Sequence, residues 1–335
     1  MALEPSEARA VRDALTRMRL LETDEQPVIT ALTGGVSSLI VRVDTRGGRL
    51  CVKKALPQLK VAALWEAPVE RNRAEVAWMK VAGRIVPGVV PEILGDDAQG
   101  NAFAMAYLEP ADYPVWKTQL LAGHADTETA RAVGINLVAI HSATADDTVC
   151  AKAFATDASF HALRLEPYFI AAAGVHPECA DALHRLVYTT ARTKLALVHG
   201  DISPKNILVG PHGPVLLDAE CAWYGDPAFD LAFCLNHLLL KTVARPQNMA
   251  AYLQCFDALK SSYLSRLTWE PAAAFEKRCA ALLSGMLLAR IDGKSPVEYI
   301  SSDLDRNRVR RVAVALLRSG VDSLSEIVQR WKLSS

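Results

Sequence analysis

Two carboxylates and one amide stand close together in a pattern that could support phosphoryl transfer. The segment 197–209 reads LVHGDISPKNILV, with four residues between Asp201 and Asn206, and Asp218 follows at the end of the next apolar run. This His-x-Asp-x-x-x-x-Asn spacing is that of phosphotransferase catalytic loops, where the aspartate accepts or orients the proton of an alcohol. Asp201 is therefore the candidate catalytic base, and it would also contact the acceptor substrate.

Oxygen ligands for a divalent metal are available in the same segment. Phosphoryl transfer requires metal ions that neutralise charge on the phosphate oxygens, and Mg²⁺ prefers hard oxygen ligands. Asn206 and Asp218 are the first candidate ligands, and Glu220 is a further one. The alternative is an ordinary turn in which Asp and Asn side chains cap backbone groups, but it explains the joint pattern less well.

The catalytic segment needs elements that hold its side chains in place. Residues 195–219 read as two apolar strands around a polar loop, which would fix the polar side chains at one edge. Toward the N-terminus, β-branched runs and glycine turns predict a small antiparallel sheet, and apolar residues at helical spacing predict helices beside it. The expected strands or extended segments are 28–32, 39–44, 50–55, 89–94 and 103–108, and the expected helices are 7–21 and 66–83.

The character of the chain changes after residue 108. Apolar periodicity predicts helices over 127–142 and 178–194, and everything beyond 228 is helical in period, broken by prolines. We therefore expect an α+β fold with two lobes. A small β-rich lobe, residues 1–107, would bind the nucleotide, and a larger, mostly helical lobe, residues 108–335, would carry catalysis and the substrate.

The triplet His-Gly-Asp at 199–201, together with Asn206 and Asp218, resembles the aminoglycoside phosphotransferase and choline kinase superfamily of small-molecule kinases. The similarity extends over about residues 28–295. Within the superfamily, Asp218-x-Glu220 in place of Asp-Phe-Gly is most similar to methylthioribose kinases. The resemblance implies a two-lobed, protein-kinase-like fold that uses ATP and Mg²⁺.

A lysine and a glutamate match the phosphate-gripping pair of this fold. Lys53 ends an apolar strand, as does the lysine that contacts the nucleotide phosphates. Lys54 is the competitor, and it would face the opposite side because side chains alternate along a strand. Glu75, in the helix that follows, is expected to orient the lysine, with Glu70 as the competitor.

Two backbone segments are candidates for the rest of the nucleotide site. The turn Thr-Gly-Gly-Val-Ser-Ser at 33–38 could bring backbone amides close to phosphates, although alone it is also an ordinary hairpin turn. The resemblance places the adenine at the hinge between the lobes, near 105–109. The residues expected to bind the nucleotide in these two segments are Gly34, Gly35, Ser37, Ser38, Ala106 and Leu108.

The acceptor side is marked less clearly. By resemblance, Trp65 belongs to a tryptophan loop near the substrate, and Arg290 stands where methylthioribose kinases present paired arginines. Here Ala289 occupies the first position of that pair, which weighs against methylthioribose as the acceptor. Trp223 could line the acceptor cleft or belong to the core. Asp230 is expected to bond the backbone of the catalytic loop.

Composition narrows the class of protein. The chain has 335 residues, 37 Lys+Arg against 37 Asp+Glu, and 51% hydrophobic residues, so it should bury a full core. Zero net charge disfavours nucleic-acid and membrane partners, and no apolar run reaches the ~20 residues of a membrane span. An acidic start and seven scattered cysteines, expected as free thiols, favour a cytoplasmic location.

We therefore expect an ATP-dependent small-molecule kinase, an enzyme that transfers the γ-phosphate to a hydroxyl of a sugar-like or amino-alcohol metabolite. One alternative is an aminoglycoside-type antibiotic phosphotransferase. The mixture of Arg290 with many later basic residues weighs mildly against such a polycationic acceptor. The alternative from another class is a nucleotide-binding pseudokinase, against which stands the presence of Lys53, Asp201, Asn206 and Asp218. The oligomeric state is left open.

Overall fold

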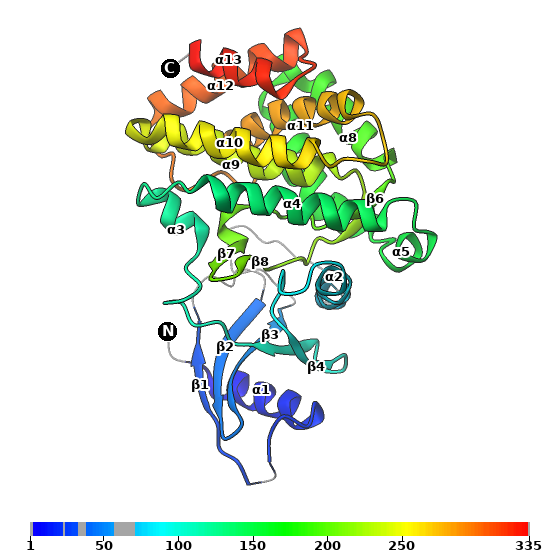
Figure 1. Ribbon diagram of the computed structural model, residues 1–335, viewed down its shortest axis with the longest axis vertical. Coiled ribbons are helices and arrows are strands. Elements are labelled where there is room, and N and C mark those ends of the chain that lie inside the picture. Colours follow the sequence, from blue (N-terminus) through cyan, green and yellow to red (C-terminus); the bar gives the residue numbers. More distant parts are fainter. Residues whose placement is uncertain (1–2, 23, 33–37, 57–70, 334–335) are drawn as a thin grey trace.

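A five-stranded antiparallel sheet forms the N-terminal region of the computed structural model (Figure 1), which describes residues 3–22, 24–32, 38–56 and 71–333. The strand order is β1-β2-β3-β5-β4, so β3 lies at the centre. The bounds are β1 (Val28–Ala31), β2 (Ser38–Thr45), β3 (Gly48–Ala55), β4 (Ile93–Asp97) and β5 (Ala102–Ala106). The predicted sheet is confirmed. β4 begins later than expected, and Pro91, which lacks an amide hydrogen for the ladder, precedes it.

Two helices flank this sheet. Helix α1 (Pro5–Arg17) places Val11 and Leu15 in a buried cluster with Val41 and Val52 of the sheet. Side chains alternate along β3, so Lys53, which follows Val52, points to the other face of the sheet. There it meets helix α2 (Arg71–Ile85). One face of the sheet therefore packs against α1, and the other face carries Lys53 toward α2.

Helix α1 ends earlier than the predicted residue 21. The chain leaves the helix at Met18, and Arg19 adopts a left-handed φ of +60°. The amide of Leu20 then bonds the carbonyl of Leu15 at 2.9 Å, which satisfies a carbonyl that the helix end would leave free. Apolar periodicity continued past this turn, so the spacing alone could not show where the helix stops.

The rest of the chain is mostly helical. Figure 1 shows the helices stacked above the sheet, with α4 and α10 in front and α12 and α13 farthest from it. The helices longer than one or two turns are α4 (Thr127–Thr144), η1 (His161–Ile170), α8 (Ala180–Arg192), α9 (Ala228–Ala244), α10 (Met249–Leu264), α11 (Ala272–Asp292), α12 (Asp303–Ser319) and α13 (Leu324–Leu333). The shorter ones are α3 (Trp116–Leu121), α5 (Thr148–Ala153), α6 (Asp157–Phe160), η2 (Pro177–Cys179), α7 (Ala171–Val175), η3 (Pro204–Asn206) and η4 (Pro246–Asn248).

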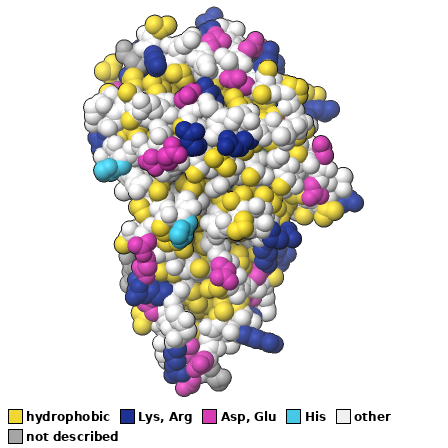
Figure 2. All heavy atoms as spheres, in the orientation of Figure 1, with side chains coloured by type: hydrophobic (Ala, Val, Ile, Leu, Met, Phe, Trp, Pro, Cys, Tyr) yellow, Lys and Arg dark blue, Asp and Glu magenta, His cyan; other side chains and the backbone are white. Residues whose placement is uncertain are grey.

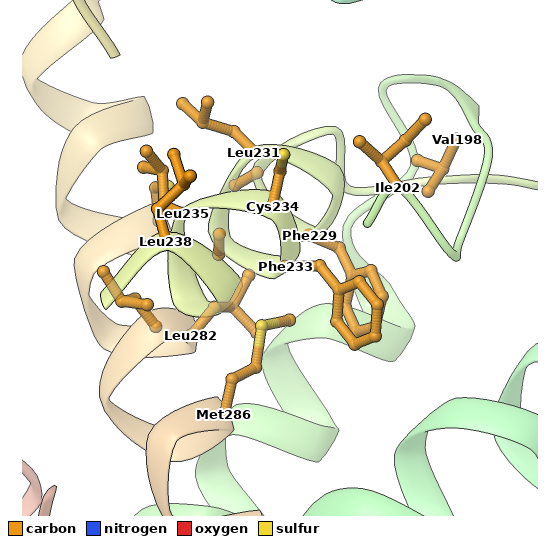
Figure 3. Packing of buried hydrophobic residues seen from close by; sticks show 14 of the residues in the cluster. Val198, Ile202, Phe229, Leu231, Phe233, Cys234, Leu235, Leu238, Leu282 and Met286 are labelled. Carbon is orange, nitrogen blue, oxygen red and sulfur yellow. The ribbon is translucent and has the colours of Figure 1, made fainter. Parts of the chain in front are cut away.

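Helix α9 is the centre of the helical core. Every residue from Ala228 to Val243 is buried. Figure 3 shows Phe229 and Phe233 on one side of this helix, and their rings stack with centroids 5.8 Å apart. Met286 of α11 packs in the same cluster. A helix that is surrounded on all sides is held rigidly, and α9 begins at Ala228, after the catalytic segment.

Two short pairs of antiparallel strands include the catalytic segment. β6 (Ala196–Val198) pairs with β9 (Trp223–Gly225), and β7 (Ile207–Gly210) pairs with β8 (Gly213–Leu216). The strand-loop-strand reading of 195–219 is confirmed, whereas β9 was not predicted. β5 ends at Ala106 and α3 begins at Trp116, so the change of architecture falls near the expected boundary at residues 107–108. The division into lobes itself stays a prediction.

The surface and the cysteines agree with the neutral composition. Figure 2 shows basic and acidic side chains interspersed over one face of the molecule. All seven cysteines are buried and free, as expected. Among the described residues, no helix is both long enough and apolar enough to cross a bilayer.

Candidate active site

The side chain of Asp230, on α9, binds the backbone of the catalytic loop. Its two carboxylate oxygens accept the amides of His199 at 2.7 Å and Gly200 at 2.8 Å. Asp230 and His199 are both fully buried, so these bonds are not exchanged with water. The expected contact between Asp230 and the loop backbone is confirmed.

His199 lies fully buried behind the catalytic loop. Its Nε2 lies 3.1 Å from the carbonyl oxygen of Leu217, and its Nδ1 accepts the amide of Asp201 at 3.1 Å. Burial lowers the pKa of His199, so the imidazole is neutral, with the proton on Nε2. The ring therefore ties the catalytic loop to the strand end that carries Asp218.

Gly200 is required by the close approach of a second chain segment. Its φ is +79°, in the left-handed region, and an added Cβ would lie 2.6 Å from the carbonyl oxygen of Cys221. Any other residue would meet backbone at that distance. The glycine thus lets the catalytic loop pack against the segment after Asp218.

Asp201 is anchored through one of its two carboxylate oxygens. Its Oδ2 lies 3.1 Å from Nη2 of Arg164, 3.1 Å from Nζ of Lys205 and 2.8 Å from Nδ2 of Asn206. Burial would raise the pKa of Asp201, but Arg164 and then Lys205 outweigh burial and hold it below its usual range. The side chain is therefore an ionised carboxylate at neutral pH. Within the described residues, Oδ1 accepts no hydrogen bond.

Asn206 and Asp218 both lie near this carboxylate. The Asn206 amide nitrogen bonds Asp201, which leaves its amide oxygen as the atom that could ligate a cation. Asp218 has a left-handed φ of +68°, which aspartate tolerates better than most residues and which is a form of strain typical of functional sites. No group of three or more His, Cys, Asp or Glu suited to a metal occurs within the described ranges. One carboxylate and one amide match Mg²⁺, which usually keeps waters and substrate phosphates as its other ligands.

Lys53 joins the sheet to the catalytic segment. Its Nζ lies 2.7 Å from Oε2 of Glu75 on α2, and it also contacts Asp218. Burial would lower the pKa of Lys53, but the charges of Asp218 and Glu75 outweigh burial and raise it. Burial would raise the pKa of Asp218, but its pairing with Lys53 holds that pKa well below its usual range. The expected ion pair between Lys53 and Glu75 is confirmed. Lys54 instead donates to the carbonyl of Gly100 on the opposite side.

Glu220 has a partner that the sequence did not suggest. Its Oε2 lies 3.0 Å from Nε of the buried Arg71, at the start of α2. A carboxylate already paired with a guanidinium is a weaker cation ligand than a free one. Asp218 is also paired, with Lys53, so the ranking of Asn206 and Asp218 before Glu220 as metal ligands stays a prediction.

A cavity of about 500 Å³ opens at the expected hinge. Its wall includes Ala106 and Leu108, together with Cys51 of β3 and Leu217, the residue before Asp218. The amide of Ala106 already donates to the carbonyl of Glu92 at 2.9 Å, so a ligand would have to use other backbone groups of this segment. The cavity thus lies where an adenine ring could be placed beside Asp218.

Several predicted residues lie elsewhere or outside the described part of the chain. Trp223 is 1% exposed, stacks on Phe160 with ring centroids 4.1 Å apart and donates to Asp157, so the structure favours the core alternative. Ser38 is buried at the start of β2, and its Oγ has no hydrogen-bond partner in the described chain. The remaining four, Gly34, Gly35, Ser37 and Trp65, lie outside the described residues.

Sequence reasoning missed Arg164, which is 7% exposed and lies on η1. Besides its pairing with Asp201, its Nε donates to the carbonyl of Gly200. A charged residue between Leu163 and Leu165 was the available signal, because a charge in an apolar run is expensive to bury without a partner. Arg290, which was predicted, is 7% exposed, and its Nη1 lies 3.2 Å from the hydroxyl of Tyr168.

The chain belongs to the phosphotransferase enzyme family, because the model of that family matches residues 28–261, well over half of its length. Two methylthioribose kinases are among its relatives. The protein of Erwinia tasmaniensis is 27% identical over 240 residues, covering 63% of this chain and 60% of the relative. The protein of Yersinia pseudotuberculosis is 25% identical over 364 aligned positions, covering 93% of this chain and 86% of the relative.

Solved structures share the fold. An ethanolamine kinase of Plasmodium vivax superposes with a TM-score of 0.55 at 12% identity, covering 88% of this chain and 83% of that chain. A macrolide 2'-phosphotransferase of Brachybacterium faecium has a TM-score of 0.51 at 16% identity, covering 97% of each chain. An aminoglycoside phosphotransferase of Alicyclobacillus acidocaldarius has a TM-score of 0.51 at 14% identity, covering 99% of this chain and 98% of that one. At such identities the likeness shows the kinase-like fold alone.

Proposed function

We propose that this member of the phosphotransferase enzyme family transfers the γ-phosphate of ATP to a hydroxyl of a small metabolite, with Asp201 as the base. The observation that carries the proposal is the asymmetric anchoring of Asp201. Three contacts fix Oδ2, at 3.1, 3.1 and 2.8 Å, and leave Oδ1 for the acceptor hydroxyl. A carboxylate whose pKa is held low remains ionised and can orient or accept that proton.

The nucleotide would bind between the sheet and the catalytic segment. The adenine would occupy the hinge cavity beside Ala106 and Leu108, with 1–107 as the nucleotide-binding lobe. Lys53, held by Glu75, would contact the phosphates. The turn of Gly34, Gly35, Ser37 and Ser38 would bring amides and hydroxyls to them. The buried, unpartnered Oγ of Ser38 fits a phosphate contact.

Asn206 and Asp218 would hold Mg²⁺, with Glu220 as an assisting group. When bound, the ion would neutralise charge on the phosphate oxygens. The donor set fits, since both side chains offer oxygen and stand beside Asp201. Asp218 also contacts Lys53, so the lysine and the metal site would be brought to the same phosphate groups.

The residues 108–335 would form the lobe that carries the acceptor. We propose a sugar-like or amino-alcohol acceptor near Asp201 and Arg290, with Trp65 beside it. The methylthioribose kinases among the relatives support a sugar-like acceptor, although this chain spans only 60% of the first of them. An antibiotic phosphotransferase is the second candidate. Its support is the Alicyclobacillus structure, which shows the fold alone. The buried free cysteines fit a cytoplasmic location.

Asp201→Asn tests the proposal. We expect phosphate transfer to fall by about 10³-fold or more, because a general base contributes this much, while ATP binding measured by calorimetry is retained. Transfer would be measured as ATP consumption against a panel of sugars, amino alcohols and aminoglycosides. Asp257→Asn, an exposed carboxylate of α10 paired with Lys260, is the matched control. Near-normal transfer by Asp201→Asn would rule out the assignment, and ATP binding without transfer by the wild type would favour the pseudokinase.

A further inference from the structure

Three buried basic side chains gather in the helical region beyond Asp201. His237 and Lys241 lie on α9, and Arg290 lies on α11. Their exposed fractions are 5%, 0% and 7%. We call these three residues the basic cluster. Basic side chains are rarely buried to this extent unless a partner compensates for their desolvation.

Within the described part of the chain, each member of the basic cluster has a nitrogen without a hydrogen-bond partner. The atoms are Nε2 of His237, Nζ of Lys241 and Nε of Arg290, all inaccessible to solvent. The Nδ1 of His237 lies 2.9 Å from the hydroxyl of Tyr299. Nζ of Lys241 and Nε of Arg290 are hydrogen-bond donors, and Nε2 of His237 is a third donor when the ring carries its proton on that atom. Within the described residues, these atoms have no acceptor.

The charges around the basic cluster do not balance. Among the described residues, the hydrogen-bond partners of Arg290 are neutral groups, the hydroxyl of Tyr168 and the carbonyl and hydroxyl of Ser295. Lys241 lies over the ring of Tyr299, 4.6 Å from its centroid, and no carboxylate pairs with either cation in the described chain. The pKa of His237 is lowered first by burial and then by surrounding cations, Arg290 and Lys241 foremost. The local potential is therefore positive.

The basic cluster is connected to the candidate base by a single tyrosine. The guanidinium of Arg164, which pairs with Asp201, lies 5.8 Å from the ring centroid of Tyr168. Arg290 lies 5.4 Å from the same ring and contacts its hydroxyl at 3.2 Å. Lys53 lies on β3 of the sheet, whereas the basic cluster lies on α9 and α11 of the helical region. A molecule that places a hydroxyl at Asp201 could therefore extend toward the cluster.

We propose that the basic cluster binds an anionic group of the acceptor, so that the substrate is a hydroxylated carboxylate or phosphate. The inference rests on the proposed kinase function and names the acceptor class for the same site. A carboxylate or phosphate offers acceptors, which is what the unpaired donors of Lys241 and Arg290 require. Burying two lysine or arginine charges without an anion would be costly, and a bound anion would remove that cost. A polycationic acceptor would meet like charges.

Binding of a simple anion tests the site without catalysis. Inorganic phosphate would be titrated calorimetrically into the full chain with ADP present. We expect Arg290→Gln and Lys241→Met each to weaken phosphate binding by about 10- to 100-fold, the usual cost of losing a charged hydrogen bond. Lys277→Met, an exposed lysine of α11 paired with Asp322, should leave it unchanged. Phosphate binding that is lost in Lys53→Met but retained in Arg290→Gln, or no binding at all, would overturn the inference.

A panel of acceptors that differ only in charge tests the substrate class. Glycerol would be compared with glycerate and glycerol 3-phosphate, and ribose with ribose 5-phosphate. We expect the anionic members to have a kcat/KM at least 10-fold higher, and Lys241→Met to reduce this preference more than it reduces use of the neutral member. Equal or better use of the neutral members would refute the anionic class while the kinase function stands. Phosphate bound at the cluster without transfer to any acceptor would count against the kinase function instead.

Discussion

The guanidinium of Arg164 and the carboxylate of Asp201 form a buried ion pair, with 3.1 Å between Nη2 and Oδ2. It joins η1 to the catalytic loop, and the Nε of Arg164 also bonds the carbonyl of Gly200, 36 positions along the chain. One side chain thus fixes both the carboxylate and the backbone next to it. Because the pair uses Oδ2, the orientation of Oδ1 toward an acceptor depends on Arg164.

Arg164→Met should damage both stability and transfer. Removing one partner of a buried pair leaves Asp201 as a buried charge with only Lys205 opposite it, which costs about 3–5 kcal/mol of unfolding free energy. Transfer should fall by about 100-fold or more, because the carboxylate is no longer held in place. Urea unfolding and ATP consumption measure the two effects. Arg185→Gln, an exposed arginine of α8, serves as the control.

The double variant Arg164→Met/Asp201→Asn separates the charge from the packing. Removing both charges eliminates the unpaired carboxylate, so the double variant should be more stable than Arg164→Met alone, by about 1–3 kcal/mol. It should remain inactive. If the two single losses of stability simply add, the ion pair does not couple the helix to the loop.

Lys53→Met and Lys54→Met form a matched pair in β3. Lys53 meets Glu75 and Asp218, whereas Lys54 meets the carbonyl of Gly100 on the opposite side. Loss of a phosphate-binding charge should lower kcat/KM for ATP by about 10²–10³-fold in Lys53→Met. Lys54→Met should stay within a few-fold of the wild type. Adenosine affinity, which does not involve phosphates, should change little in either variant. Equal effects of the two substitutions on ATP use would be inconsistent with the assignment of Lys53.

Asp218→Asn and Glu220→Gln distinguish the two carboxylates near the metal site. Glu220 pairs with Arg71 at 3.0 Å, while Asp218 faces Lys53 and the catalytic loop. We expect Asp218→Asn to weaken ATP binding at least 10-fold in the presence of Mg²⁺ and to raise the Mg²⁺ concentration needed for activity. Glu220→Gln should shift that concentration much less. A larger shift for Glu220→Gln would reverse the ranking of the ligands.

The catalytic segment could be predicted because its information is local. Asp201 and Asn206 lie on one loop, and the strands that flank the loop are apolar runs that no distant contact needs to define. The pairing of Lys53 with Glu75 could also be predicted, since a strand and the following helix carry the two residues and the spacing is typical of the fold. Such residues can be identified from the sequence around them, without knowledge of how the helices and strands pack.

Residues that act from a distant element could not be found in this way. Arg164 reaches Asp201 from a helix whose position depends on how α8 and α11 pack, and Arg71 reaches Glu220 from α2. Trp223 could not be assigned because a large aromatic residue serves a core and a cleft equally well. In each case the sequence shows the side chain, but only tertiary packing decides its partner.

Lys241→Met should stabilise the protein in a way that depends on pH. Burial, aided by the nearby Lys117, lowers the pKa of Lys241 to about 7, well below the ordinary lysine value of about 10.4. Between these values the unfolded chain binds more protons than the folded one, so wild-type stability rises with pH, by at most about 1.4 kcal/mol per pH unit. The charged and titratable groups that face Lys241 are Lys117, Arg290, His237, Cys234, Glu298 and Tyr299.

Below pH 7 the full cost of a buried, unpaired ammonium is present in the wild type, and the methionine variant avoids it. We therefore expect Lys241→Met to gain about 1–4 kcal/mol at pH 6, and the gain to shrink steadily up to pH 8.5. Urea unfolding at a series of pH values measures the difference between the two chains, in which the titration of other groups cancels. Leu240→Met, a buried apolar exchange at the adjacent position, should change neither the sign nor the slope. Parallel stability curves for the wild type and Lys241→Met would show that the lysine is already neutral or already paired at pH 6.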